Sequence, residues 1–153
     1  MDTCFNLKNL GYYNLKKRIK LNEGFSTKPY KDQLGHLTIG YGHLILPNEK
    51  FFLEKRIYKK DLEEIFEKDF NKALSGFNKT LKPFASNKKE ADLLIEMIFQ
   101  LGIKGCFKFK KLFKNMKKGN KYLVCFEMMD SLWYKQTPYR VKSLVKTFLN
   151  NEQ

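Results

Sequence analysis

The sequence predicts a mainly helical α+β protein with one small antiparallel β region near its N-terminus. From about residue 59 onward, apolar residues recur at spacings of three and four, the pattern of amphipathic helices. Glycines and short alternating runs concentrate between residues 24 and 57, which favours turns and strands there. The chain has 153 residues, of which 42% are apolar, enough for the core of one domain.

The first helix and the β region can be placed from individual residues. Leu15 and Ile19 lie four positions apart and predict a helix over residues 12–22, which Gly24 ends. Asp32 and Gly35 stand at the first and fourth positions of a type I turn. The alternating residues 36–39 then predict the return strand of a hairpin.

Apolar spacing predicts five further helices, which cover about residues 62–77, 87–101, 107–116, 121–132 and 138–148. We expect Ser86 to be the N-cap of the second of these and Gly102 to end it. Thr137 is the expected N-cap of the last helix, because Pro138 suits the first helical position.

Positive charge is the unusual feature of the composition. Lys and Arg number 30 against 16 Asp and Glu, which gives a net charge of +14. This charge favours a polyanionic partner such as nucleic acid, an anionic membrane or an anionic cell wall, but does not choose among them. A lysine-rich composition without any partner explains the same number.

The cysteines and the N-terminus predict where the protein is made. Cys4, Cys106 and Cys125 form no CxxC pair and no even set, so we expect reduced thiols without a metal or redox role. No apolar run is long enough for a signal peptide or a membrane anchor. We therefore expect synthesis in the cytoplasm, with release through the membrane if the substrate lies outside it.

Two carboxyl groups are candidates for acid–base chemistry. Glu23 and Asp32 flank the junction between the first helix and the hairpin. Glycoside hydrolysis commonly needs one protonated and one ionised carboxyl group. The negative end of a helix disfavours ionised Glu23, whereas Asp32 in an exposed turn should stay ionised. Thr38 on the return strand could hold a water with its hydroxyl, or could be an ordinary β-branched strand residue.

Three ordered blocks of the sequence resemble the phage-type lysozymes, glycoside hydrolase family 24. The blocks are Glu23 with Tyr30-Lys31-Asp32, Gly35 and Thr38-Ile39-Gly40-Tyr41-Gly42-His43; Met97-Ile98-Phe99-Gln100-Leu101-Gly102; and Trp133-Tyr134-Lys135-Gln136-Thr137-Pro138-Tyr139-Arg140. The resemblance implies one catalytic domain, residues 1–153, with a β-containing lobe at about 24–57. A long helix would join it to a helical lobe at about 78–150, which the N-terminal helix would complete, with the substrate cleft between the lobes.

The resemblance also implies an activity. Family members hydrolyse the link between N-acetylmuramic acid and N-acetylglucosamine in peptidoglycan, most with inversion and without cofactor or metal. Glu23 matches the general acid, Asp32 the carboxylate that positions the attacking water, and Thr38 its hydroxyl partner. Peptidoglycan glycan strands are the expected partner of a monomer that lyses cell walls, as in phage release.

Other site residues follow from the resemblance alone. Phe99 and Gln100 match residues that line the cleft. His43 matches a structural histidine paired with the long helix, where Asp69 stands at the matching place. Arg140 matches an arginine that pairs with the acid and would lower the pKa of Glu23, against the effect of the helix end. The sequence does not decide between these opposing effects.

Several departures from the best-known family member affect the cleft. The segment between residues 43 and 57 is shorter, and an N-terminal extension precedes the first helix. Leu34, Glu127 and Leu132 differ from that member's cleft residues, and Leu112 replaces a small hydroxyl residue. These changes bear on subsite preference rather than on the reaction class.

Some features of the sequence also suggest two functions other than hydrolysis. A basic protein with 14 Phe and 8 Tyr could bind single-stranded nucleic acid, but most of these aromatics fall on apolar helix faces and no recognition motif is present. We therefore expect no nucleic-acid partner and no stable membrane insertion. A lysozyme fold that binds glycan without cutting it would be free to lose Glu23, Asp32 and Thr38, which this sequence keeps.

Overall fold

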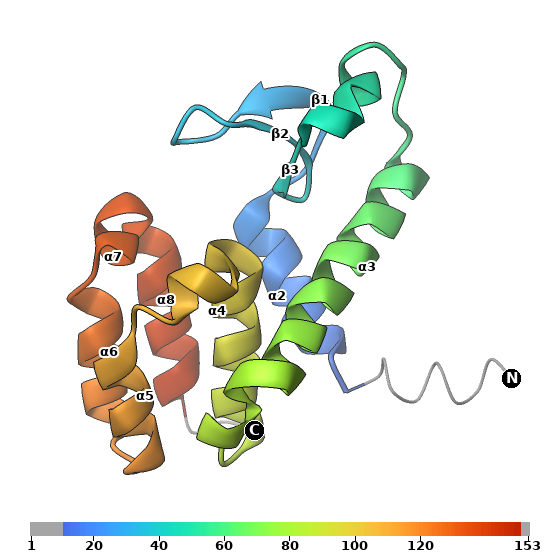
Figure 1. Ribbon diagram of the computed structural model, residues 1–153. Helices are drawn as coiled ribbons and strands as arrows, with labels where there is room; N and C mark the ends of the chain where they lie inside the picture. The colour runs from blue at the N-terminus through green and yellow to red at the C-terminus, as the bar shows by residue number, and fades with distance from the viewer. Residues whose placement is uncertain (1–10, 151–153) are drawn as a thin grey trace, which may run out of the picture. The chain divides into compact units, whose positions relative to one another are not determined.

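The computed structural model describes residues 11–150 and confirms a mainly helical α+β fold (Figure 1). Its elements are α2 (Tyr13–Glu23), β1 (Ser26–Lys31), β2 (Leu37–Gly40), β3 (His43–Leu44), the 3-10 helix η1 (Pro47–Leu53), α3 (Lys59–Gly76), the π-helix η2 (Phe77–Leu81), the 3-10 helix η3 (Lys82–Phe84), α4 (Lys88–Cys106), α5 (Lys110–Lys117), α6 (Lys121–Met129), α7 (Leu132–Gln136) and α8 (Pro138–Leu149). The expected N-terminal extension and Cys4 lie outside the described residues.

The chain divides into two compact units, Met1–Asn71 and Lys72–Gln153. The first unit therefore includes α2 and most of α3, together with the β region. Leu15 and Ile19, the two residues that predicted α2, are both buried. Lys16 Nζ lies 2.7 Å from Glu67 Oε2 on α3, so α2 runs beside the first half of that helix.

The sheet of the first unit has three antiparallel strands in the order β1-β2-β3. The predicted turn is present, because the Gly35 N–H donates to the Asp32 carbonyl at 3.0 Å. Ile39 on β2, Phe52 on η1 and Leu62 on α3 form a small buried cluster beneath the sheet. Strand β3 and helix η1 were not predicted, because their few residues show neither a strand nor a helix period.

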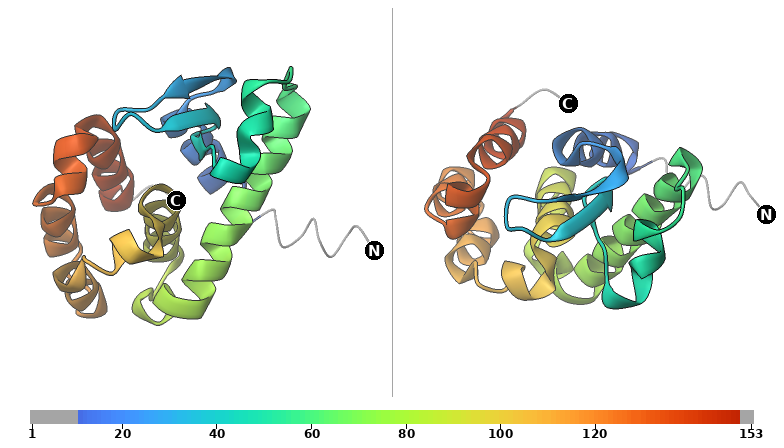
Figure 2. Two further views of the ribbon diagram at one scale, coloured as in Figure 1. Left: turned by 45° about the horizontal axis from the view of Figure 1, so that its top comes forward. Right: turned by 90° about the horizontal axis from the view of Figure 1, so that it is seen from above.

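In the second unit, α8 packs against α4, α6 and α7, and α5 packs against α6 (Figure 2). Cys106 and Cys125 are buried free thiols. Burial raises the pKa of Cys106 to about 12 and that of Cys125 to about 11, so both thiols resist forming the reactive thiolate. Within residues 11–150, no helix has the length and apolar character needed to cross a membrane.

The predicted N-cap of the helix at residues 87–101 was wrong by one residue, whereas its predicted end is confirmed. Asn87, not Ser86, is the N-cap: its Oδ1 accepts the Glu90 N–H at 2.9 Å, whereas the Ser86 N–H donates to the Glu90 side chain. The regular helix ends at Gly102, as predicted, because the backbone there has φ 73° and ψ 165° and is not helical. A second helical segment follows the kink and brings α4 to Cys106.

One prediction nearer the C-terminus also needs correction. The segment 121–132 is not one helix, because Ser131 begins a separate helix, α7, by accepting the Tyr134 N–H with its Oγ at 3.1 Å. Thr137 is the N-cap of α8, as predicted, although its side chain makes no cap bond. Its hydroxyl instead donates to the Trp133 carbonyl at 3.1 Å.

Candidate active site

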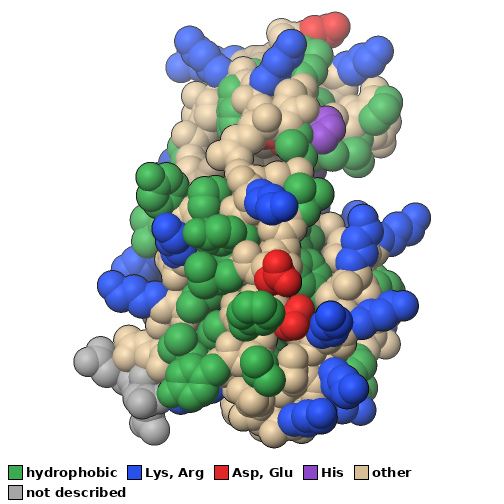
Figure 3. Space-filling view, turned by 90° about the vertical axis from the view of Figure 1, so that its left-hand side faces the viewer, with side chains coloured by type: hydrophobic (Ala, Val, Ile, Leu, Met, Phe, Trp, Pro, Cys, Tyr) green, Lys and Arg blue, Asp and Glu red, His purple; other side chains and the backbone are tan. Residues whose placement is uncertain are grey.

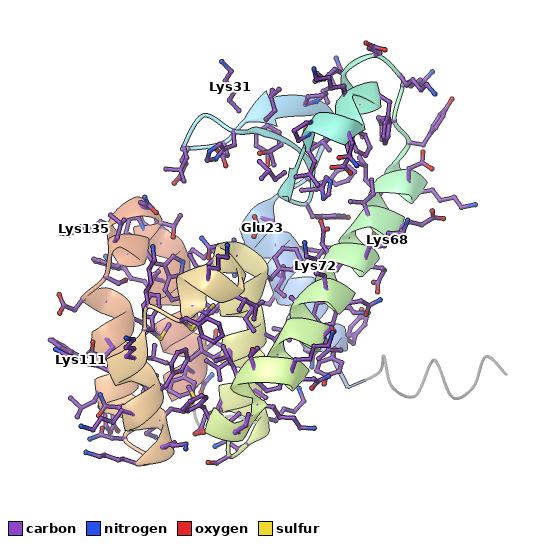
Figure 4. All side chains as sticks on the ribbon, in the orientation of Figure 1. Glu23, Lys31, Lys68, Lys72, Lys111 and Lys135 are labelled. Carbon is purple, nitrogen blue, oxygen red and sulfur yellow. The ribbon has the colours of Figure 1, made fainter. Side chains whose placement is uncertain are left out.

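Glu23 is the last residue of α2, at the point where the chain turns into β1 (Figure 4). Gly24 follows with φ +73° and closes the helix by donating its N–H to the Lys20 carbonyl at 3.1 Å. The Glu23 carboxyl group lies directly against the Cα of Gly42. A Cβ at Gly42 would be closer to Glu23 Oε2 than real side-chain contacts allow. The tight turn between β2 and β3 therefore forms one wall of the Glu23 site.

Asp32 opens the β1–β2 turn and is held as a carboxylate. Its Oδ1 accepts the His36 N–H at 2.8 Å and the Leu34 N–H at 2.9 Å. Desolvation by itself raises the pKa of Asp32, but these two backbone bonds and the nearby His36 ring outweigh it and lower the pKa below its ordinary value. The expectation that Asp32 stays ionised agrees with this geometry.

Tyr30 connects the two carboxyl groups electrostatically. Its pKa is raised first by burial, then by the Glu23 carboxylate and then by that of Asp32. Both acids therefore act on the same phenol, which lies two positions before Asp32 on β1. Lys31, which lies between Tyr30 and Asp32 in the chain, projects away from α2 at the end of the strand (Figure 4). The resemblance included Tyr30 without a role, and the strand period could have placed it on the same face as Asp32.

Thr38 is 4% exposed and pairs with Tyr30 across the β1–β2 ladder. Its Oγ1 donates to the His36 carbonyl at 3.0 Å. Because that bond uses the hydroxyl proton, Thr38 can act toward a water only as an acceptor. An acceptor here would orient a water whose proton points at Thr38, which suits an attacking water.

His43 joins β3 to two other elements. Its Nδ1 lies 2.7 Å from Asp69 Oδ2 on α3, which is the pair that the resemblance implied. Its Nε2 lies 3.1 Å from Glu49 Oε2 on η1, a second partner that was not predicted. The pKa of His43 is raised, chiefly by the hydrogen bond to Asp69, against an opposing effect of burial. The ring ties β3, η1 and α3 together at one point.

The remaining candidates lie in the second unit. Gln100 on α4 accepts the Trp133 Nε1–H with its Oε1 at 2.9 Å and donates its Nε2 to Thr137 Oγ1 at 3.3 Å. These bonds fix the orientation of the Gln100 amide, and Phe99 precedes it on the same helix. Gln100 belongs to one of the sequence blocks that resemble the family, and Trp133 and Thr137 belong to another.

Arg140 on α8 has a carboxylate neighbour that the sequence did not indicate. Its Nη2 lies 3.7 Å from Glu96 Oε2, and Glu96 is fully buried. The one feature of the sequence that could have drawn attention to Glu96 is its position inside the apolar run of α4, between Ile95 and Met97. The pairing of Arg140 with Glu23 stays a prediction.

Among residues 11–150, no group of three or more His, Cys, Asp or Glu side chains could hold a metal ion. The described site contains two carboxyl groups, Glu23 at a helix end and Asp32, which backbone donors keep ionised. The charges of both act on the phenol of Tyr30. These groups are carried by a mainly helical fold with a small three-stranded sheet.

Comparison with known proteins gives the family. The family model described as phage lysozyme matches residues 20–147, and the chain belongs to that family. It is 31% identical to Probable T4-type lysozyme 2 of Dictyostelium discoideum, over 88% of this chain and 93% of that protein. It is 30% identical to Probable T4-type lysozyme 1 of the same organism, over 86% and 91% of the two chains.

A third relative is a larger protein. The chain is 26% identical to Pre-baseplate central spike protein Gp5 of Enterobacteria phage T4, over 89% of this chain but 28% of that protein. Membership in the family supports a muramidase-type activity for the chain.

Proposed function

We propose that this protein hydrolyses the β-1,4 link between N-acetylmuramic acid and N-acetylglucosamine within the glycan strands of bacterial peptidoglycan. The observation that carries the proposal is the placing of Glu23 and Asp32 around Tyr30. Glu23 ends a helix against Gly42, and Asp32 is held ionised by two backbone N–H groups. One carboxyl group can then donate a proton while the other acts as a base.

In the proposed reaction, Glu23 protonates the glycosidic oxygen as the bond to the anomeric carbon breaks. Asp32 accepts a hydrogen bond from the attacking water and takes its proton as the new carbon–oxygen bond forms. Thr38 accepts the second hydrogen bond of that water, because its own proton is given to His36. Product release would leave Glu23 ionised and Asp32 protonated, and exchange with solvent restores both groups.

The second unit supplies the proposed sugar contacts. Phe99 and Gln100 are proposed to contact the glycan, and the bonds of Gln100 to Trp133 and Thr137 pre-position its amide for that purpose. His43 and Asp69 are proposed to support the β region rather than to touch substrate. No cofactor takes part in the proposed mechanism.

The positive charge fits a wall-directed enzyme. Lys and Arg side chains are spread over the face shown in Figure 3, where few acidic side chains are visible. Such a surface attracts the anionic polymers of a bacterial wall from a distance. We further propose that the protein acts as a monomer, is made in the cytoplasm and reaches the wall after release through the membrane, where it causes lysis as in phage release.

The bond that is cut can be identified from the products. Purified peptidoglycan is digested to completion, the new reducing ends are reduced with borohydride, and the fragments are analysed by mass spectrometry. The proposal predicts reduced N-acetylmuramic acid at the new ends. Reduced N-acetylglucosamine would show cleavage of the other glycosidic link, and intact strands would show that the protein binds glycan without cutting it.

A further inference from the structure

The first unit contains a cavity of about 610 Å³ that the proposed reaction does not use. Its walls come from η1, from the segment 54–58 and from the first half of α3, which lie beside one another in Figure 1. None of Glu23, Asp32 and Thr38 lines it. Its volume is within the range of ligand pockets, which are about 300–1,000 Å³.

Two exposed aromatic rings are held at the rim of this cavity. Phe51 is 44% exposed, and its ring packs against buried Phe52 with centroids 4.4 Å apart. Tyr58 is 59% exposed, and the Arg56 guanidinium lies 5.5 Å from the centre of its ring. These neighbours restrain both rings without burying them. Flat, restrained aromatic faces suit the C–H face of a sugar ring.

The charges that line the cavity are balanced, although the whole chain carries +14. Lys55, Arg56 and Lys68 line the cavity together with Asp61 and Glu64, while His43 lies between the carboxylates of Asp69 and Glu49. A polyanion gains little from such a lining. A neutral ligand with many hydroxyl and amide groups gains both donors and acceptors.

Apolar side chains also contribute much of the lining. Ile57 and Ile65 are half-buried and extend the cluster of Ile39, Phe52 and Leu62 into the cavity wall. Such a patch is large enough for a methyl group beside a polar rim. Acetamido sugars combine a methyl group, an amide and hydroxyls within one ring.

We propose that this cavity is a second glycan-binding site, which takes a neutral N-acetylated oligosaccharide apart from the Glu23 site. The proposal rests on the proposed function, because wall glycan is the source of such sugars. The ring faces of Phe51 and Tyr58 stack on the sugar, and the charged rim binds its hydroxyls. A second contact of this kind holds the enzyme on the wall while the other site reacts.

The test uses the full chain with Glu23→Gln, so that added sugar is not consumed. Tri-N-acetylchitotriose is titrated into 15N-labelled protein, and backbone amide shifts are followed by NMR. The proposal predicts a group of shifts at residues 51–69 whose saturation curve is separate from that of residues 23–42. Tyr58→Ala should raise the dissociation constant obtained from residues 51–69 at least about tenfold, equivalent to about 1.4 kcal/mol. The dissociation constant obtained from residues 23–42 should not change.

Tyr139→Ala is the matched control, because Tyr139 is an 87% exposed aromatic in the second unit. If Tyr58→Ala perturbs the fold, Arg56→Ala is an independent variant. It should also raise the dissociation constant obtained from residues 51–69. Shifts confined to residues 23–42, or equal effects of Tyr58→Ala and Tyr139→Ala, would overturn the proposal. Saturation of residues 51–69 by inorganic phosphate instead of the trisaccharide would make the cavity an anion site and overturn it too. Because the titration measures binding without cleavage, its result is independent of the product analysis that tests the proposed function.

Discussion

The carboxyl group of Glu23 and the Cα of Gly42 are in direct contact, so the end of α2 and the β2–β3 turn together define where the acid lies. Gly42 has φ +74°, a region that residues with a Cβ rarely adopt. The contact leaves no room for any side chain at position 42. The position of the proposed acid therefore depends on a residue that carries no chemistry of its own.

Gly42→Ala should reduce hydrolysis by about 100-fold, because the new methyl group must displace the Glu23 carboxyl group and small misplacements of a catalytic group are costly. The strained backbone adds about 1–2 kcal/mol of instability. The measurements are the initial rate of reducing-end release and the free energy of unfolding. Gly35→Ala is the control, since Gly35 has φ +84° but open space around its Cα. If the two variants lose equal activity, backbone strain and not the Glu23 contact explains the loss.

Stability should fall as the pH rises through the folded-state pKa of His43. That pKa is raised, chiefly by the hydrogen bond to Asp69, above its ordinary value of 6.5. The folded state therefore holds the proton more tightly, and the stabilisation is complete below about pH 6.5 and lost above the folded pKa. Urea unfolding at pH 6 and pH 9 measures the difference. Asp69→Asn should shrink it, whereas an unchanged difference would show that the pair has no part in stability.

The opposite sign applies to Asp32, whose lowered pKa contributes stability that disappears only as acid protonates it. The pH range in which this contribution to stability is lost lies below about pH 4. It is well separated from the pH range in which the contribution of His43 changes.

Arg140→Ala should destabilise the second unit, because it removes a cation that pairs with the fully buried Glu96 carboxylate. Removing one member of a buried pair typically costs about 3–5 kcal/mol. Glu96→Gln combined with Arg140→Ala should cost less than the sum of the two single changes. Chemical denaturation of the four proteins in this cycle gives the coupling energy. A coupling of zero would mean that the 3.7 Å approach of these two groups contributes no stability.

Lysis of whole cell walls should fall steeply with salt, whereas cleavage of a short neutral oligosaccharide should change little. The Debye length shrinks from about 10 Å at 0.1 M salt to about 3 Å at 1 M, which screens long-range attraction but not contact chemistry. Reversing the exposed Lys114 and Lys118 to Glu should weaken wall binding, while Arg at the same positions should not. Equal salt responses of the two substrates would mean that the lysines are compositional background.

The sequence could predict those parts of the fold that carry a local pattern, either apolar residues at helical spacing or the residues of a turn. Leu15 and Ile19 marked α2, and Asp32 with Gly35 marked the β1–β2 turn. The start of α4 was misplaced by one residue because Ser86 and Asn87 are both good N-caps. Two bonds in the structure distinguish them: the Glu90 N–H donates to Asn87 Oδ1, and the Ser86 N–H donates to the Glu90 side chain.

The site divides in a similar way. Glu23, Asp32 and Thr38 could be named because their residue types and order match a family. Glu49 and Glu96 could not, since their roles depend on contacts with His43 on β3 and Arg140 on α8 that no sequence spacing predicts. Gly42 was inside a recognised block, but its contact with Glu23 depends on how two turns approach each other in space.

The most direct test of the central claim, that Glu23 is the general acid, is the rate of peptidoglycan hydrolysis by Glu23→Gln. The substitution keeps the size of the side chain but removes the proton that the leaving oxygen needs. General acid catalysis contributes roughly 10²–10⁴-fold, so the initial rate of reducing-end release should fall by that factor while the folded structure persists. A rate within about threefold of the unsubstituted protein, far smaller than that contribution, would contradict the assignment of Glu23.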